Sequence, residues 1–141
     1  MVHAWQFWAL LSAMFAALTA ILAKVGVAGI SSDMATFIRT TVILAMTAVI
    51  VVSFGQWQRL DTIPGKTWIF LVLSGLATGA SWLCYFRALN LGSASQVAPV
   101  DKLSVVMVAV FGVLLLGEHL AVHHWAGVAL MAVGAVLVAM P

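Results

Sequence analysis

Asp101 and Lys102 stand side by side two residues after Pro99, in a stretch where nearly every other side chain is apolar. The whole chain has only six Lys and Arg and four Asp and Glu residues, so two of its few charges meet here. An ionisable side chain inside a membrane costs about 2.5–3.5 kcal/mol on insertion scales, and it marks a charge partner or a solute pathway. At a membrane surface the pair needs no function, because Asp101 favours a helix N-terminus and Lys102 reaches water.

The start of the helix that carries this pair decides between the embedded and the interfacial interpretation. A helix that begins near Pro99 places the proline in its tolerated first turn and leaves the charges at the interface. A helix that begins near Ser93 or Ser95 places them two turns into the membrane. An apolar loop over residues 91–98 would leave backbone groups unsatisfied in lipid, which favours the earlier start.

Hydroxyl groups follow one face of a segment further upstream. Ser74, Thr78, Ser81 and Tyr85 recur at steps of four, three and four, as neighbours on a helix face do, and Arg87 lies just beyond them. Such a stripe either bonds to neighbouring helices or lines a polar cavity. The residues that we expect to bind a solute or line its pathway are Ser12, Arg39, Ser74, Thr78, Ser81, Tyr85, Arg87, Asp101, Lys102 and Ser104.

Histidines gather near the end of the chain, but they do not predict a metal centre. Glu118, His119, His123 and His124 are close in sequence, and a wet interfacial cluster explains them better than a metal site because they straddle a joint. Cys84 is the only cysteine, which excludes a disulfide framework and a CxxC motif. No nucleophile–base pair and no phosphate-binding glycine loop appears, so we expect no catalytic residue, no metal and no cofactor.

The composition defines the solvent in which these residues act. Hydrophobic residues make up 65% of the chain and charged residues 7%, whereas soluble domains have roughly 45–50% and 25%. A soluble fold of 141 residues could not hide that much apolar surface. The chain is therefore expected to lie in a lipid bilayer, and a formal net charge of +2 is too small to indicate nucleic-acid binding.

The charges divide the chain into apolar lengths close to the roughly 20 residues that cross a bilayer. Residues 4–23, 40–58 and 67–86 carry no charge, and residues 119–141 carry only histidines. We predict an all-α integral membrane protein, a compact bundle of five transmembrane helices in a single domain over residues 1–141. The expected spans are approximately 4–24, 35–55, 67–89, 94–117 and 120–140.

The charges do not predict which way the chain inserts. With five spans, the positive-inside rule compares Arg59 and Lys66 on one side with Lys24, Arg39, Arg87 and Lys102 on the other. If Arg39, Arg87 and Lys102 are held within spans and are not counted, the side with more positive charges is the opposite one. Either the chain inserts both ways and pairs with an inverted copy, or helix packing or a partner sets its orientation.

The run YFRALNLGSASQVAPVDKLSVVMVAVFGVLLLGEHL, residues 85–120, resembles the EamA domain of the drug/metabolite transporter superfamily. An RAL helix end, a short Gly/Ser/Ala hairpin, an apolar helix and an LGE ending carry the resemblance. The segments ALLSAMFAALTAILAKVGV and SGLATGASWLCYFRAL are also similar to that domain, and the resemblance covers essentially the whole chain.

The resemblance implies a secondary transporter (permease) for a small metabolite or drug-like solute in the cytoplasmic (inner) membrane. Larger members are similar to two such domains fused in inverted orientation, so a single domain implies a homodimer, plausibly antiparallel. The related small multidrug resistance proteins carry an acidic residue in their first span, which has no counterpart in residues 4–23. The alternative is a non-transporting membrane subunit that assists assembly or lipid handling.

Overall fold

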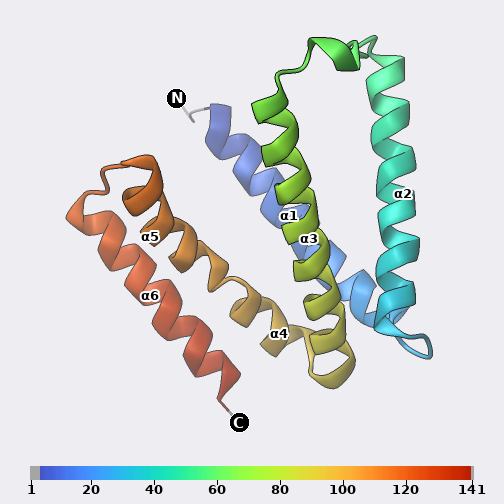
Figure 1. Cartoon of the computed structure of the whole chain (residues 1–141). Coiled ribbons are helices and arrows are strands. Elements are labelled where there is room, and N and C mark those ends of the chain that lie inside the picture. The colour runs from blue at the N-terminus through green and yellow to red at the C-terminus, as the bar shows by residue number, and fades with distance from the viewer. Residues whose placement is uncertain (1–3, 141) are drawn as a thin grey trace. The chain divides into compact units, whose positions relative to one another are not determined.

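The computed structural model describes residues 4–140, and all the regular elements within them are helical (Figure 1). The absence of strands in this part of the chain confirms the predicted all-α class. In chain order the elements are α1 (Ala4–Gly26), α2 (Ser32–Ser53), the 3₁₀ turn η1 (Leu60–Thr62), α3 (Gly65–Leu91), α4 (Ala94–Asp101), α5 (Ser104–Leu116) and α6 (Val122–Ala139).

Five segments among the described residues are long and apolar enough to cross a membrane. Four are the single helices α1, α2, α3 and α6, and the remaining one, Ala94–Leu116, combines α4 with α5. Their lengths of 18 to 27 residues match a hydrocarbon core about 30 Å thick. The prediction of a multi-pass membrane protein with five spanning helices is confirmed.

The chain forms two compact units. We call Val25–Asn90, which contains α2, η1 and α3, the central unit. The terminal unit consists of the chain up to Lys24, which is most of α1, and the chain from Leu91 onward, with α4, α5 and α6.

The N-terminus of α2 is capped by its own sequence. Ser31 has an extended backbone, and its hydroxyl accepts a hydrogen bond from the Met34 N–H at 3.3 Å. Asp33 lies in the first turn, where a carboxylate favours the positive end of the helix. Because Ser31 satisfies an N–H that would otherwise be unpaired, it favours the start of α2 at Ser32.

The connection from α2 to α3 carries its charges outside the spanning helices. Arg59 and Asp61 form a two-pronged ion pair around η1, with Nη2 and Oδ2 2.8 Å apart. Pro64 then precedes α3, where its carbonyl accepts the first helical bond, from the Trp68 N–H. Figure 1 shows α2 and α3 running in opposite directions on either side of this connection.

The fourth spanning segment begins early and is interrupted. Ser93 is the N-cap of α4, so the helix takes the earlier of the two starts and Pro99 lies inside it. Pro99 has no N–H and crowds the preceding turn. Beyond it the backbone changes to i→i−3 bonds, with the N–H groups of Leu103, Val105 and Val106 each bonded to the carbonyl three residues earlier at 3.0 Å. This tight turn separates α4 from α5 (Figure 1).

In the terminal unit α6 packs back along both pieces of the interrupted segment. Its closest helix neighbour is α4, followed by α5, to which it is joined by a short hairpin. Gly117 closes α5 with a φ of 67°, and the next N–H, from Glu118, bonds to the Gly112 carbonyl at 3.1 Å. Lys24 at the end of α1 donates to the Gly92 carbonyl at 2.8 Å, which fixes the start of this segment against α1.

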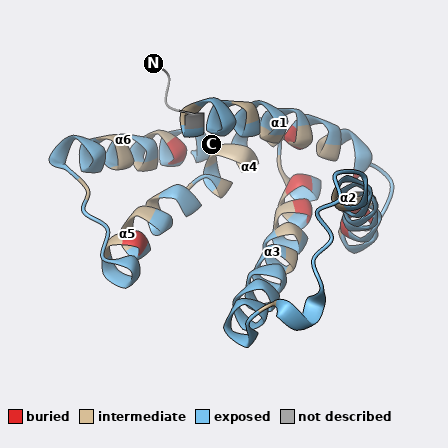
Figure 2. Cartoon of the chain, turned by 90° about the horizontal axis from the view of Figure 1, so that it is seen from above, coloured by how far each residue is buried: buried red, intermediate tan, exposed pale blue. Residues whose placement is uncertain are grey.

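Buried side chains are few in every described helix, as Figure 2 shows. In the central unit they include Thr36, Phe86 and Leu89, and in the terminal unit Ala20 and Ala135. Large apolar side chains are exposed along all the spanning helices. In water such a surface would aggregate, whereas acyl chains or another membrane helix cover it without penalty.

Gly117 provides a test of this fold. Replacement Gly117→Ala should lower the free energy of unfolding by about 1–2 kcal/mol, because an L residue is strained at positive φ. The measurement is unfolding of the purified chain in mixed micelles with increasing denaturing detergent. Gly127→Ala is the control, since Gly127 lies within α6 and an added Cβ there meets nothing within 4 Å. Equal stability of the two variants would contradict the described hairpin.

Candidate functional site

A groove with a volume of about 440 Å³ lies within the central unit, between α2 and α3. One wall comes from the middle of α2 and the other from the N-terminal two thirds of α3. Both walls belong to spanning segments, so the groove opens at membrane depth. Its lining residues are Thr40, Ile43, Leu44, Thr47, Leu71, Ser74, Gly75, Thr78, Gly79 and Trp82.

Three threonines on the walls use their hydroxyl protons within their own helices. Thr40, Thr47 and Thr78 each donate to the carbonyl oxygen four residues earlier, at 2.8, 2.9 and 2.9 Å. This bond satisfies the hydroxyl donor in a medium without water. The threonine oxygens keep free lone pairs, so these residues offer the groove hydrogen-bond acceptors on otherwise apolar walls.

Two glycines give the α3 wall its depth. Gly75 and Gly79 have the GxxxG spacing that is typical of close helix packing in membranes. Here, however, a Cβ added at either position meets nothing within 4 Å. The missing side chains therefore leave open space in the groove.

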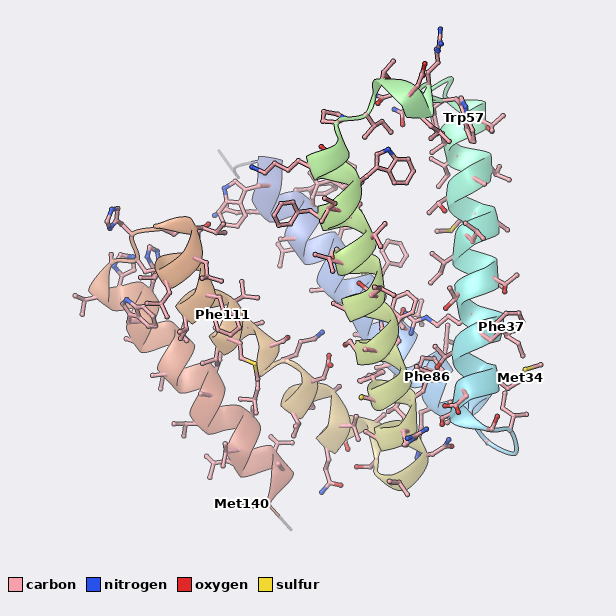
Figure 3. All side chains as sticks on the ribbon, in the orientation of Figure 1. Met34, Phe37, Trp57, Phe86, Phe111 and Met140 are labelled. Atoms are coloured by element: carbon pink, nitrogen blue, oxygen red, sulfur yellow. The ribbon has the colours of Figure 1, made fainter. Side chains whose placement is uncertain are left out.

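Arg39 is not among the lining residues, but it adjoins Thr40 in α2 and lies against Trp82, and these two residues form one end of the groove. The Arg39 guanidinium carbon is 4.4 Å from the centre of the Trp82 ring and 5.5 Å from that of Phe86. Phe86 is 3% exposed, and Figure 3 shows it on the side of α3 that faces α2. The Arg39 side chain is half-buried between α2 and α3.

Two of the other basic residues of the central unit, Arg59 and Arg87, form ion pairs with its acidic residues. Arg87 contacts Asp33 with Nη2 and Oδ1 3.3 Å apart, and Arg59 holds Asp61 in the loop. Asp33 and Asp61 are the acidic residues of this unit. None of the ion pairs among the described residues includes Arg39, so aromatic rings are its neighbours in place of a carboxylate.

The terminal unit contains a pair of charged side chains within a spanning segment, at the break between α4 and α5. Asp101 is half-buried, and its Oδ2 is 3.4 Å from Nζ of the adjacent Lys102. Because the helix begins at Ala94, Asp101 lies about 10 Å along the spanning segment. Ser104 starts α5 with an exposed side chain, and Ser12 is exposed on α1.

The predicted hydroxyl stripe divides in the structure. Ser74 and Thr78 line the groove, but Ser81 and Tyr85 do not. The next lining residue on α3 after Gly79 is Trp82. Sequence reasoning missed Trp82 because it followed polar atoms only. The signal was present in the spacing, since Thr78, Trp82 and Phe86 recur at steps of four and share a helix face.

The histidine cluster has a structural role where α6 begins. His124 Nδ1 accepts a hydrogen bond from the Ala121 N–H at 3.2 Å and so caps the helix, while its ring lies 4.0 Å from that of His123 between centres. Within residues 4–140, no three His, Cys, Asp or Glu side chains are grouped so that they could hold a metal ion.

The fold defines a multi-pass helical membrane protein with a groove between two of its spanning helices. The model of the EamA-like transporter family matches residues 3–140, and the chain therefore belongs to that family. The predicted resemblance is confirmed over essentially the whole chain. Membership in a transporter family points away from an enzyme.

Two relatives are similar to this chain. An "Uncharacterized transporter in cobO 3'region" of Sinorhizobium sp is 67% identical over 140 residues, which cover 99% of each chain. The "Probable 4-amino-4-deoxy-L-arabinose-phosphoundecaprenol flippase subunit ArnE" of Proteus mirabilis (strain HI4320) is 28% identical over 86 residues, 60% of this chain and 76% of the relative. No solved structure matches the chain significantly.

The stacking of Arg39 on Trp82 can be measured by a double-mutant cycle. Arg39→Gln and Trp82→Leu should be non-additive by about 0.5–2 kcal/mol in the free energy of unfolding, because each single change already removes the cation–π contact. Unfolding in mixed micelles measures all four chains. Arg59→Gln combined with Trp82→Leu is the matched control and should be additive, since Arg59 lies in the loop beside Asp61. Additivity in both cycles would show that the stacking does not form.

Proposed function

We propose that the protein is a secondary transporter that moves a small metabolite or drug-like solute across the cytoplasmic (inner) membrane. The observation that carries this proposal is the α2–α3 groove, a partly polar space within spanning helices of a transporter-family member. Its volume of about 440 Å³ falls in the range of roughly 300–1,000 Å³ that is typical of small-molecule sites.

We propose that the solute binds in the groove, at Arg39, Ser74 and Thr78. We also propose that Asp101 and Lys102 form a second polar site on its pathway. The break between α4 and α5 supports this second site. Irregular backbone at membrane depth is tolerated where it is buried in protein or lines a cavity, and transporters bind solutes and ions at interrupted helices. Ser12, Ser81, Tyr85, Arg87 and Ser104 are further candidates for the pathway.

We further propose that two copies act together as a homodimer in inverted orientation. Two observations support this arrangement: the balanced distribution of Lys and Arg, and the Sinorhizobium relative, which is matched over 99% of its own length by the same single repeat. Inverted repeats place a solute site at the interface between the repeats. A second copy would also cover part of the exposed apolar surface.

Filling the groove tests the transport proposal. Gly79→Leu should reduce solute flux about tenfold or more, because a side chain placed in the groove competes with the solute and overpacking costs about 1–3 kcal/mol. Vesicles containing the purified protein are loaded with a defined mixture of small carboxylates, amines, sugars and amino acids. The loss of each compound is followed by mass spectrometry against protein-free vesicles.

Gly127→Leu is the control for this experiment, because Gly127 lies in α6 and does not line the groove. It should transport like the unmodified chain. If Gly79→Leu also transports normally while folding normally, the groove is not on the pathway. If the unmodified chain moves no compound of the mixture, transport of these classes is excluded.

The inverted dimer predicts two membrane orientations of one sequence. In a Cys84→Ser background with Asp61→Cys in the α2–α3 loop, about half of the molecules in intact cells should react with a membrane-impermeant thiol reagent. Adding Thr62→Lys should lower that fraction, because a positive charge retains the loop in the cytoplasm. Labelling of nearly all or nearly none of the molecules before the lysine is added would exclude dual insertion.

A second candidate function is that of a subunit in a lipid-handling complex. The similarity to a probable flippase subunit over 86 residues favours it. This function requires a stable complex with a different protein and no solute flux by the purified chain. Native mass measurement of the complex extracted from membranes distinguishes the two, since a homodimer supports the transporter and a hetero-complex supports the subunit.

A further inference from the structure

We propose that the α2–α3 groove binds a small organic anion with an apolar body, and that Arg39 holds its carboxylate or phosphate. This inference deepens the proposed transport function and rests on it for the role of the groove. It is carried by the way Arg39 is surrounded: aromatic rings at its guanidinium, no carboxylate partner, and an open groove beside it.

The position of Arg39 makes an unpaired charge costly. Arg39 lies seven residues after Ser32, about 10 Å along a spanning helix. A charge at membrane depth is costly, and a cation–π contact offsets only part of that cost. The stacking on Trp82 therefore holds the guanidinium in place but leaves it short of full compensation, which an anion would supply.

The central unit offers no internal anion for this purpose. Asp33 contacts Arg87 near the start of α2, and Asp61 is bound to Arg59 in the loop. With both acidic residues of the unit paired elsewhere, no carboxylate of the central unit is left to pair with Arg39.

The stacking also determines which part of Arg39 is available. A guanidinium group is planar, with its five N–H donors directed outward in the plane. The guanidinium carbon lies over the Trp82 ring, and no hydrogen bond among the described residues of the central unit uses the N–H donors at the edge of the Arg39 guanidinium. Carboxylates and phosphates bind that edge through two parallel hydrogen bonds, so the stacked Arg39 is prepared for such a group.

The groove walls define the rest of the ligand. Thr47 and Thr78, which lie further from Arg39 than Thr40 does, donate within their helices and present acceptor oxygens, which repel a negative charge. The anionic group is therefore restricted to the Arg39 end. Ile43, Leu44 and Leu71 line the space beyond it and match an apolar body.

Charge selectivity of binding to the full-length chain tests this inference. The protein is reconstituted in phosphatidylcholine vesicles, and equilibrium binding is measured for phenylacetate and its neutral and cationic analogues, phenylacetamide and phenethylamine. Phenylacetate should bind about tenfold or more tightly than either analogue, because a charge-assisted hydrogen-bonded pair contributes that much. Equal binding of the three compounds, or a preference for the amine, overturns the inference without the use of any variant.

Substitutions then locate the charge. Arg39→Gln should abolish the preference for phenylacetate, and Arg39→Lys should retain part of it, because lysine keeps the charge but lacks the fork. Arg59→Gln is the matched control and should bind as the unmodified chain does, since Arg59 lies in the loop. An unchanged preference in a folded Arg39→Gln chain overturns the inference.

The bilayer could itself supply the anion through a lipid phosphate group. Vesicles with added phosphatidylglycerol separate this source from a soluble solute. Phenylacetate binding that is unaffected by the anionic lipid supports the inference. Displacement of phenylacetate by the lipid identifies a headgroup as the occupant and overturns it.

Flux measured in the same vesicles separates this inference from the transport function. A solute flux that Arg39→Gln leaves unchanged, together with unselective binding, leaves transport standing and overturns the anion site. Arg39-dependent binding of phenylacetate without flux of any compound supports the anion site and contradicts transport.

Discussion

Hydrocarbon offers no hydrogen-bond partner, and this absence governs how each polar group of the chain is placed. The spanning segments are helical because a helix satisfies its backbone internally, over lengths of 18 to 27 residues. The same constraint explains the side chains, since the Thr40 and Thr78 hydroxyls bond to carbonyls of their own helices. At the start of α2, Ser31 caps an N–H group that the helix leaves open. Polar groups that remain without such an internal solution are therefore informative.

Arg39 is such a group. Its neighbours are the rings of Trp82 and Phe86, whereas Arg87 takes the nearby carboxylate of Asp33. A pairing of Arg39 with an acidic residue would form a closed structural ion pair. The arrangement described for the central unit leaves the positive charge beside the open groove between α2 and α3, where we propose that a ligand binds.

The break between α4 and α5 answers the same constraint in a different way. Pro99 lacks the N–H that would bond to the carbonyl four residues earlier. One turn later, the N–H groups of Leu103 and Val105 bond to carbonyls three residues earlier. Asp101 and Lys102 pair with each other at that turn. In the terminal unit the charged pair Asp101 and Lys102 thus lies on an interrupted helix. In the central unit Arg39 lies between two continuous helices.

The sequence by itself determined the class of the protein, because 65% hydrophobic residues and four charge-free lengths near 20 residues permit few structures other than spanning helices. Local reasoning also favoured the early start of α4, because an apolar loop over residues 91–98 would leave backbone groups unsatisfied in lipid. Only the tertiary structure decided that Trp82, and not Ser81 or Tyr85, continues the groove, and that aromatic rings surround Arg39. The physical reason is that helical periodicity orders side chains around one axis, whereas the rotation of that axis against a neighbour depends on how the two surfaces pack.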